Sequence, residues 1–377
     1  MRLLMVSGDR QVAIGERGPF HSMQREFSRY FERIDVLCPR PERPVTVRTI
    51  HERVHFHPAD CGRSGMPGYI ARRGAELIAE HGHALIVSHD YGWFYNGMAA
   101  ARISARTGVP YLSEIHHVPG YPVAADLRER FDRAVARRYV RWARTRARAF
   151  RVVNHDEMPP LLESWGVPRE RIVVLPSLYI DLETFRPAER RPAPEQDLVF
   201  VGRLVNNKGL DRIVEALDRL ARAGRPARTL FVGKGPLARR LLADVHRRGL
   251  EAHVRYVDWL ATPADLAEVY RRSRAIVCAS TCEGGPRVTV EAMACGTPAV
   301  STRVGMMGEL IEPGVNGELV GFDADSLTAG IERLLGDEAR RAELGRRAAE
   351  AGARFEYARV LRGYAHGLYD LVGEPRP

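Results

Sequence analysis

Lysine is almost missing from this sequence. Of its 57 basic residues only Lys208 and Lys234 are lysines, and the others are arginines. Both lysines stand in glycine-flanked segments just after predicted strands, where a compact ammonium group holds a phosphate as well as a guanidinium does. A phosphate-binding role and chance retention are both open interpretations of these two positions.

Long apolar runs are absent as well. No stretch approaches the ~20 residues of a membrane-spanning helix, and the first eight residues turn polar too soon for a signal peptide, so we expect a strand there. The five cysteines form no tight pairs, which predicts reduced thiols in a cytosolic compartment. Hydrophobic residues at 45% and charged residues at 28% exclude a disordered chain, and 377 residues suffice for two domains.

The net charge of +10 is densest in residues 126–150, which hold nine arginines and three acidic residues. Apolar residues recur there at roughly helical spacing and predict a basic amphipathic helix, namely Leu127, Phe131, Val135 and Trp142. Its polar side suits either solvent or anionic lipid head groups. At an anionic membrane surface each basic residue contributes ~1 kcal/mol to the binding free energy. Nucleic acid is the least favoured partner, because no stacking motif or nucleic-acid module is present.

Short apolar runs alternate with longer amphipathic stretches along the chain. This alternation predicts parallel sheets with helices on both faces. The polar, proline-rich segment 186–195 is the predicted linker. We therefore expect an α/β protein of two Rossmann-like, doubly wound domains that face a central cleft, residues 1–186 and 187–377. The segment 355–372 is expected to close the second domain as one or two helices. The predicted strands are Leu3–Ser7, Ile34–Cys38, Val54–His57, Ala84–Ser88, Tyr111–Ile115, Arg151–Asn154, Leu198–Gly202, Thr229–Gly233, Val254–Val257, Ala275–Cys278 and Pro298–Ser301.

Ligands of open parallel sheets bind beyond the carboxyl ends of the strands. Glycines, cations, histidines and carboxylates follow several of the predicted strands, namely Gly15, Gly18, His116, His117, Arg203, Lys208, Lys234, Glu283 and Arg287. This arrangement suits an anionic, sugar-containing ligand between the two domains.

The segment 282–298 is the most informative part of the sequence. Glu283 lies in a glycine-containing loop, and Glu291 lies eight residues later on the predicted helix. Gly284 and Gly285 leave backbone N–H groups uncovered, and the helix start presents free donors and the positive end of its dipole to phosphate oxygens. The alternative is a tight turn in which the glycines serve only the backbone and Glu291 lies on a solvated face.

This segment resembles the Glu-x7-Glu signature of the retaining glycosyltransferases of family four. That family has the GT-B fold of two Rossmann-like domains and uses nucleotide sugars. The loop 202–209 is similar to its Gly-Arg-Leu…Lys-Gly loop, and the turn 233–236 is similar to its Gly-x-Gly-Pro turn, so Gly233 is a candidate contact of the donor. The resemblance implies that the first domain binds the acceptor and the second the nucleotide sugar.

The resemblance also implies roles for single residues. Arg203 and Lys208 would hold the donor diphosphate, Glu283 would meet hydroxyl groups of the donor sugar, and Glu291 would meet the ribose. The backbone of a short run would line the sugar and the phosphates, namely Gly284, Gly285, Pro286 and Arg287.

The first half of the chain offers a histidine. The segment 110–116 resembles the family's strand that ends in a histidine touching the donor sugar, with Glu114 in place of the usual threonine and His117 in place of the usual aspartate. His116 is the favoured candidate, His117 is the alternative, and a histidine that serves only the strand end is the third interpretation. Gly15 is the candidate phosphate contact in the loop after the first strand.

These features together predict a retaining glycosyltransferase that moves a hexose from a nucleotide-diphosphate sugar to a sugar, lipid-linked or small-molecule acceptor. Cations stabilise the departing diphosphate, and the resemblance implies front-face attack without a metal or a cofactor. The alternatives are a GT-B epimerase or phosphorylase, a non-catalytic sugar-nucleotide-binding subunit and, with least support, a zinc hydrolase built on the His-Glu-x-x-His pattern at 51–55. We expect a cytoplasmic protein, with attachment to the inner membrane face through 126–150 as an open alternative.

Overall fold

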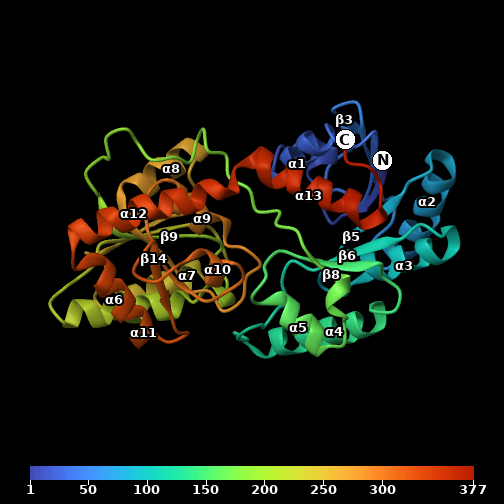
Figure 1. Ribbon diagram of the computed structural model, residues 1–377. Coiled ribbons are helices and arrows are strands. Elements are labelled where there is room, and N and C mark those ends of the chain that lie inside the picture. The colour runs from blue at the N-terminus through green and yellow to red at the C-terminus, as the bar shows by residue number, and fades with distance from the viewer.

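The computed structural model describes residues 1–377 and divides them into two α/β domains, between which the chain passes once in an extended segment and again near its C-terminus (Figure 1). Each domain is built on its own sheet. The first has the order β3-β4-β2-β1-β5-β6-β7-β8, in which only β3 is antiparallel to its neighbour, and the second is parallel with the order β11-β10-β9-β12-β13-β14. The predicted arrangement of two doubly wound domains is therefore confirmed.

The strands are β1 (Arg2–Val6), β2 (Arg33–Cys38), β3 (Thr49–Ile50), β4 (Val54–Pro58), β5 (Leu85–His89), β6 (Tyr111–Glu114), β7 (Ala149–Val152), β8 (Ile172–Val174), β9 (Gln196–Val201), β10 (Thr229–Val232), β11 (Val254–Val257), β12 (Ser273–Cys278), β13 (Ala299–Thr302) and β14 (Gly317–Val320). The α-helices are α1 (Pro19–Phe27), α2 (Met66–His81), α3 (Tyr95–Thr107), α4 (Leu127–Ala143), α5 (Met158–Ser164), α6 (Leu210–Arg222), α7 (Ala238–Arg247), α8 (Pro263–Arg271), α9 (Arg287–Ala294), α10 (Met307–Leu310), α11 (Ala324–Leu335), α12 (Glu338–Gly352) and α13 (Tyr357–Val372). The 3-10 turns are η1 (Val12–Ile14), η2 (Arg169–Arg171), η3 (Asn206–Lys208) and η4 (Ala353–Phe355).

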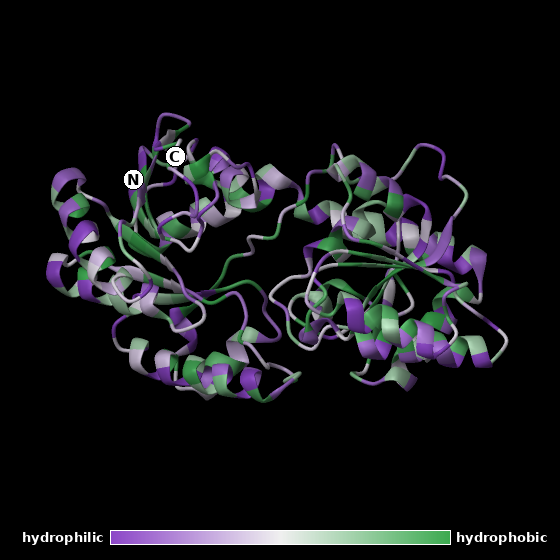
Figure 2. Cartoon of the chain, turned by 180° about the vertical axis from the view of Figure 1, so that it is seen from behind, coloured by the Kyte–Doolittle hydropathy of each residue, from purple (hydrophilic) through white to green (hydrophobic).

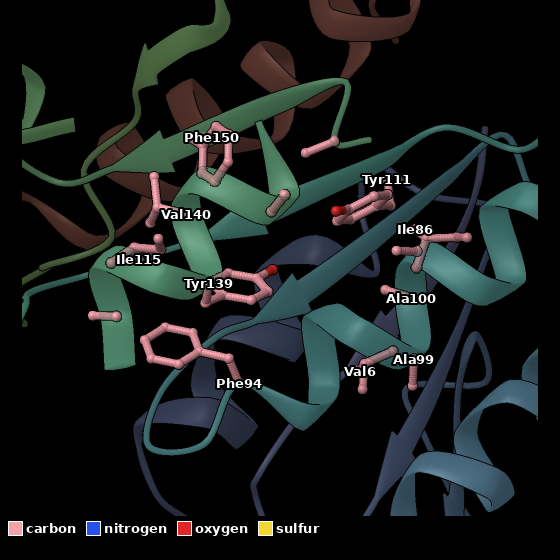
Figure 3. Close-up of a cluster of buried hydrophobic side chains, with 14 of the residues drawn as sticks. Val6, Ile86, Phe94, Ala99, Ala100, Tyr111, Ile115, Tyr139, Val140 and Phe150 are labelled. Carbon is pink, nitrogen blue, oxygen red and sulfur yellow. The ribbon is translucent and has the colours of Figure 1, made fainter. Parts of the chain in front are cut away.

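The central strands are buried on both faces, because helices pack against both faces of each sheet. Four successive residues of β1, Leu3 to Val6, are fully buried, as expected for a parallel strand without a solvent face. Figure 2 shows these apolar strands between helices whose outer sides are hydrophilic. Figure 3 shows one side of the first core, in which Phe94 stacks on Tyr139 with ring centroids 4.5 Å apart.

The last helix departs from the prediction. We expected the whole of 187–377 to belong to the second domain, but α13 returns to the first domain, so that both chain ends lie there (Figure 1). Its apolar residues Leu361, Tyr364 and Leu368 are buried in the same core as residues of β1, β2 and α1. The sequence pattern marks the apolar face of this helix but does not determine which of two open sheet faces it covers.

Several boundaries also differ from the prediction. The strands β3, β8 and β14 were not predicted, because they contain only two, three and four residues. The basic helix α4 spans Leu127–Ala143 rather than the whole of 126–150: the side chain of Asp126 caps it by accepting a hydrogen bond from the Glu129 N–H, and β7 begins at Ala149. None of the helices is long and apolar enough to cross a membrane.

Candidate active site

Lys208 and Glu283 meet because their loops follow neighbouring strands. Lys208 comes after β9 and Glu283 after β12, and these strands pair in the centre of the second sheet. The backbone carbonyl of Asn207 accepts a hydrogen bond from the Thr281 N–H at 2.8 Å, which joins the two loops. The Lys208 ammonium then forms an ion pair with the Glu283 carboxylate, whose Oε1 also accepts a hydrogen bond from the Ser280 hydroxyl at 2.9 Å. Both side chains are largely buried, with exposed fractions of 14% and 16%.

A close backbone approach brings the next loop to the same edge. Gly233, after β10, has φ +139°, and a Cβ there would lie 1.9 Å from the carbonyl oxygen of Gly202. Gly202, after β9, has φ +155°. Only glycine fits such a contact. The approach brings the loop that carries Arg203 and Lys208 against the turn that begins at Gly233.

The backbone N–H groups of Gly284 and Gly285 have no hydrogen-bond partner within the protein. They precede α9, which begins at Arg287 after Pro286 and has no side-chain cap. Free amides and the positive end of a helix dipole favour an anion at this position. A Cβ on Gly284 would lie 2.7 Å from the carbonyl oxygen of His116, so the two domains touch here.

The larger of two adjoining cavities has a volume of about 620 Å³ and lies between the domains. It is lined by Gly202, Arg203, Gly233, Lys234, Asp258, Trp259, Arg287 and Glu291, among others. Burial raises the pKa of Glu291 to about 7, while the positive charge of Arg287 acts in the opposite direction. Glu291 is only 7% exposed, which excludes the alternative that it lies on a solvated face.

The smaller cavity, of about 300 Å³, lies on the side of the first domain. Its walls include His116, Gly284, Gly285 and Arg287. The guanidinium of Arg287 lies over the ring of Tyr179, 4.4 Å from its centroid, and both residues line the two cavities. A ligand with a diphosphate between a nucleoside and a sugar matches this geometry of two cavities joined at one cation.

Both candidate histidines reach the cleft. His116 lines the smaller cavity. Desolvation lowers the pKa of His117. The charge of Glu283 opposes this shift, and the positive charges of His116, Lys208 and Arg203 add to it. The structure therefore places His117 within electrostatic reach of the residues that follow β9 and β12.

Gly15 is a candidate that lines neither cavity. It ends η1 with φ +83°, it is exposed, and a Cβ there would lie nearest to the Thr46 side chain at 3.4 Å. Pro19 and Phe20, at the start of α1, do line the smaller cavity. A glycine that ends a helical turn and one that opens a phosphate loop have the same sequence pattern, and the phosphate contact of Gly15 stays a prediction.

Polar contacts fix the two domains around the cleft. Glu309 Oε1 accepts hydrogen bonds from the backbone N–H groups of His155 at 2.5 Å and Asp156 at 2.8 Å. The Glu157 carboxylate accepts one from the Gly305 N–H at 2.7 Å. Burial raises the pKa of Glu157 to about 8. These hydrogen bonds therefore connect the two domains at the cleft.

Sequence reasoning missed Trp259 and Tyr179. Trp259 lies two residues after the end of β11, lines the larger cavity and is 69% exposed, so the rule that ligands bind at strand ends would have found it. Tyr179 lies in the segment between the domains and has no such signal. The structure contains no group of three or more His, Cys, Asp or Glu side chains that could hold a metal ion, and His51 of the zinc-like pattern lies in a turn with φ +49°.

Comparison with known proteins gives the family. A glycosyl transferase 4-like domain model matches residues 20–177, and a model of glycosyl transferases group 1 matches residues 181–351. The D-inositol 3-phosphate glycosyltransferase of Nocardiopsis dassonvillei is 31% identical over 306 residues, which cover 76% of this chain and 70% of that protein. The chain belongs to the group 1 glycosyltransferases. A D-inositol 3-phosphate glycosyltransferase of Frankia alni is 30% identical to it over 362 residues, covering 86% of this chain and 85% of that one.

Solved structures show the fold of this glycosyltransferase. The sucrose-phosphate synthase of Thermosynechococcus elongatus superposes with a TM-score of 0.80 at 20% identity and covers 99% of each chain. HepE of Anabaena, in complex with UDP and glucose, gives a TM-score of 0.73 at 20% identity and covers 98% of this chain and 100% of its own. The GT-B architecture and the glycosyltransferase class predicted from the sequence are confirmed.

Proposed function

We propose that the enzyme transfers a hexose from a nucleoside-diphosphate sugar to an acceptor hydroxyl, with retention at the anomeric carbon. One observation carries the proposal: Lys208, Arg203 and the free amides of Gly284 and Gly285 lie at one edge of the second sheet, facing the first domain. Positive groups aimed at the oxygens that gain charge lower the barrier when the diphosphate leaves.

The larger cavity is proposed to hold the nucleoside. The exposed face of Trp259 offers a surface for the base, and the Glu291 carboxylate offers acceptors for the ribose hydroxyls. The diphosphate would then lie against Arg203, Lys208 and the start of α9. The sugar would occupy the smaller cavity beside His116 and Gly284, next to Glu283 in the chain. In this placement Glu283 meets hydroxyl groups of the sugar once Lys208 has turned to the phosphate.

Transfer then breaks the bond between the anomeric carbon and the phosphate oxygen and forms the bond to the acceptor oxygen on the same face. The departing phosphate oxygen takes the acceptor's proton, so the step balances without a carboxylate nucleophile. Arg203 and Lys208 are proposed to supply the positive charge that the diphosphate needs. We therefore expect the rate to be unchanged by EDTA, and a rate that depends on an added divalent cation would contradict this part of the proposal.

An acceptor that carries a phosphate is proposed for the first domain. A cavity of about 220 Å³ lies at the carboxyl ends of β1, β2 and β4 and is lined by Arg10, Arg40 and Arg63. Guanidinium groups bind phosphate oxygens in bidentate fashion. The two relatives named above are called D-inositol 3-phosphate glycosyltransferases, which supports a phosphorylated polyol as the first acceptor to assay.

Attachment to an anionic membrane surface is a separate proposal. Trp93, Leu127 and Phe131 are 68%, 77% and 55% exposed, and the rings of Trp93 and Phe131 lie 6.0 Å apart. They adjoin the arginine-rich face of α4, a combination that suits the interface of an anionic bilayer. Sedimentation with phosphatidylglycerol vesicles should fall with salt and should be lost in Trp93→Ser/Phe131→Ser, but not in Leu242→Ser. Binding that is absent, or that ignores salt, would remove the proposal.

The catalytic proposal is tested with a panel of UDP-, GDP- and ADP-sugars, first by thermal shift and then by turnover. Donors that bind the folded protein raise its melting temperature. We expect nucleotide release only when an acceptor is present and a product with the donor's anomeric configuration by NMR. Conversion of donor alone would favour an epimerase, a need for free phosphate would favour a phosphorylase, and binding without turnover would favour a non-catalytic subunit.

A further inference from the structure

Three titratable residues form a row across the first sheet. His89, Glu114 and Arg151 are Cα partners at the carboxyl ends of β5, β6 and β7. Partners in register on parallel strands project their side chains from the same face. The side chains of Glu114 and Arg151 are each 1% exposed and that of His89 is 14% exposed. The row also lines the smaller cavity.

Glu114 is the centre of this row. Its carboxylate lies 3.1 Å from Nη1 of Arg151 and 3.2 Å from Nε2 of His89. Burial would raise the pKa of Glu114, but the charge of Arg151 and the contacts with the histidines hold it below its usual range. Burial lowers the pKa of His89 to about 4, so this imidazole is neutral near pH 7. The row therefore consists of one anion, one cation and one neutral ring.

Arg151 connects the row to His116. Its Nη1 lies 3.1 Å from Nε2 of His116, whereas the nearest Glu114 oxygen is 3.6 Å from that nitrogen. A guanidinium has donors and no acceptor, so Nε2 of His116 accepts this hydrogen bond. A neutral imidazole that accepts at Nε2 carries its proton on Nδ1. The remaining Arg151 nitrogens donate to the Leu175 carbonyl at 2.8 and 2.5 Å, which fixes the plane of the guanidinium.

Tyr364 of α13 closes the network from the other side. Its hydroxyl donates a hydrogen bond to Glu114, and its ring lies under the Arg151 guanidinium, 3.8 Å from the centroid. The helix that returns from the second domain therefore touches both members of the ion pair. A buried ion pair adds little net stability relative to apolar side chains. The location of this pair beside His116 therefore fits a role in orienting His116 better than a role in stabilising the fold.

We propose that the Glu114–Arg151 pair, locked by Tyr364, is a positioning device that holds His116 in one ring orientation with its proton on Nδ1. This inference rests on the proposed function, in which His116 lies beside the donor sugar. The Nδ1–H edge is then the one available to a sugar oxygen, and it is preset before the donor arrives. Glu114, Arg151 and Tyr364 are positioning residues, because they act through His116.

A matched pair of variants tests the kinetic consequence. Tyr364→Phe removes the hydroxyl and keeps the ring over Arg151. Tyr369→Phe makes the same change on the same helix, where the hydroxyl donates to the Tyr30 carbonyl at 2.6 Å. We expect Tyr364→Phe to lower kcat about tenfold with donor KM changed less than about twofold, since a hydrogen bond to a charged group is lost. Tyr369→Phe should change neither, and equal losses in both variants would overturn the proposal.

A spectroscopic measurement tests the tautomer without turnover. In protein labelled with 15N-histidine, the His116 signals are assigned by their loss in His116→Asn. We expect the Nδ1–H tautomer in the wild type and its loss in Arg151→Met; if Arg151→Met does not fold, a partial shift toward the other tautomer in Tyr364→Phe serves the same purpose. The Nε2–H tautomer in the wild type would overturn the positioning role whatever the activity. The Nδ1–H tautomer in a protein without transferase activity would instead overturn the proposed function alone.

Discussion

Replacing Lys208 by methionine should remove most of the transfer rate and leave the protein folded. The Lys208 side chain is 14% exposed and paired with Glu283, whose only other side-chain partner is Ser280 at 2.9 Å. One preorganised cation at a developing negative charge contributes about 3–4 kcal/mol to transition-state stabilisation. At 1.36 kcal/mol per tenfold, kcat should fall roughly 100- to 1000-fold.

The same substitution costs stability for a separate reason. Glu283 loses its ion pair in a largely buried position, which destabilises the fold by about 1–3 kcal/mol. Adding Glu283→Gln removes the unpaired charge, so the double variant should regain stability in urea denaturation. It should not regain kcat, because the cation for the diphosphate is still missing. Recovery of both quantities would mean that Lys208 serves only the fold.

The second lysine provides the matched comparison. Lys234 is 64% exposed, lies 3.7 Å from Asp258 and lines the larger cavity. Its surface ion pair contributes about 0–1 kcal/mol to stability. Lys234→Met should therefore raise donor KM a few-fold, with kcat and the unfolding free energy unchanged. Steady-state kinetics on the two variants separate these effects, and a Lys208→Met enzyme that retains kcat within about threefold would refute the reasoning.

Three further predictions concern pH and backbone geometry. Because burial raises the pKa of Glu291 to about 7, the ionised fraction of its carboxylate falls about tenfold between pH 8 and pH 6. Donor KM should therefore rise as the pH is lowered over this range. Glu291→Gln should abolish this pH dependence of KM. Gly233→Ala should destabilise the protein by several kcal/mol more than Gly224→Ala in urea denaturation. Both glycines have positive φ, but only at Gly233 would a Cβ meet a backbone atom, at 1.9 Å. Equal losses of stability in the two variants would contradict the close approach. Burial raises the pKa of Asp35, but hydrogen bonds from His57, His83 and Arg33 hold it below the usual range. The stability that this carboxylate contributes is thus present above about pH 4 and is lost as the pH falls further toward its folded pKa. Asp35→Asn should lower the unfolding free energy at pH 7 by about 2–4 kcal/mol and flatten its decline below pH 4; an unchanged decline would show that other groups control it.

The strand ends of the second sheet could be predicted from the sequence. Apolar runs mark β9 and β12, and the rule that ligands bind at carboxyl ends then places Lys208 and Glu283 at one edge. The pattern of apolar runs does not give the order of the strands in the sheet, so it does not predict that these two residues form an ion pair. That contact arises because β9 and β12 are neighbours in the sheet.

Other features depend on tertiary packing. The buried position of Glu291 follows from how α9 packs against α8, where the Tyr270 hydroxyl lies 3.5 Å from its carboxylate. The return of α13 brings Tyr364 next to Glu114, 250 residues earlier in the chain. No local spacing encodes such a contact, and for the same reason the sequence indicates a histidine after β6 but not what holds it.

The most direct test compares a nucleoside diphosphate with the corresponding monophosphate by isothermal titration, using the uridine, guanosine and adenosine pairs. If Arg203, Lys208 and the amides of Gly284 and Gly285 hold the diphosphate, the second phosphate should tighten binding about 100-fold, equivalent to about 2.7 kcal/mol. In Arg203→Met/Lys208→Met this advantage should fall to about tenfold or less, with binding of the monophosphate little changed. Equal affinities for diphosphate and monophosphate in the wild-type enzyme would contradict a diphosphate site at this edge of the sheet.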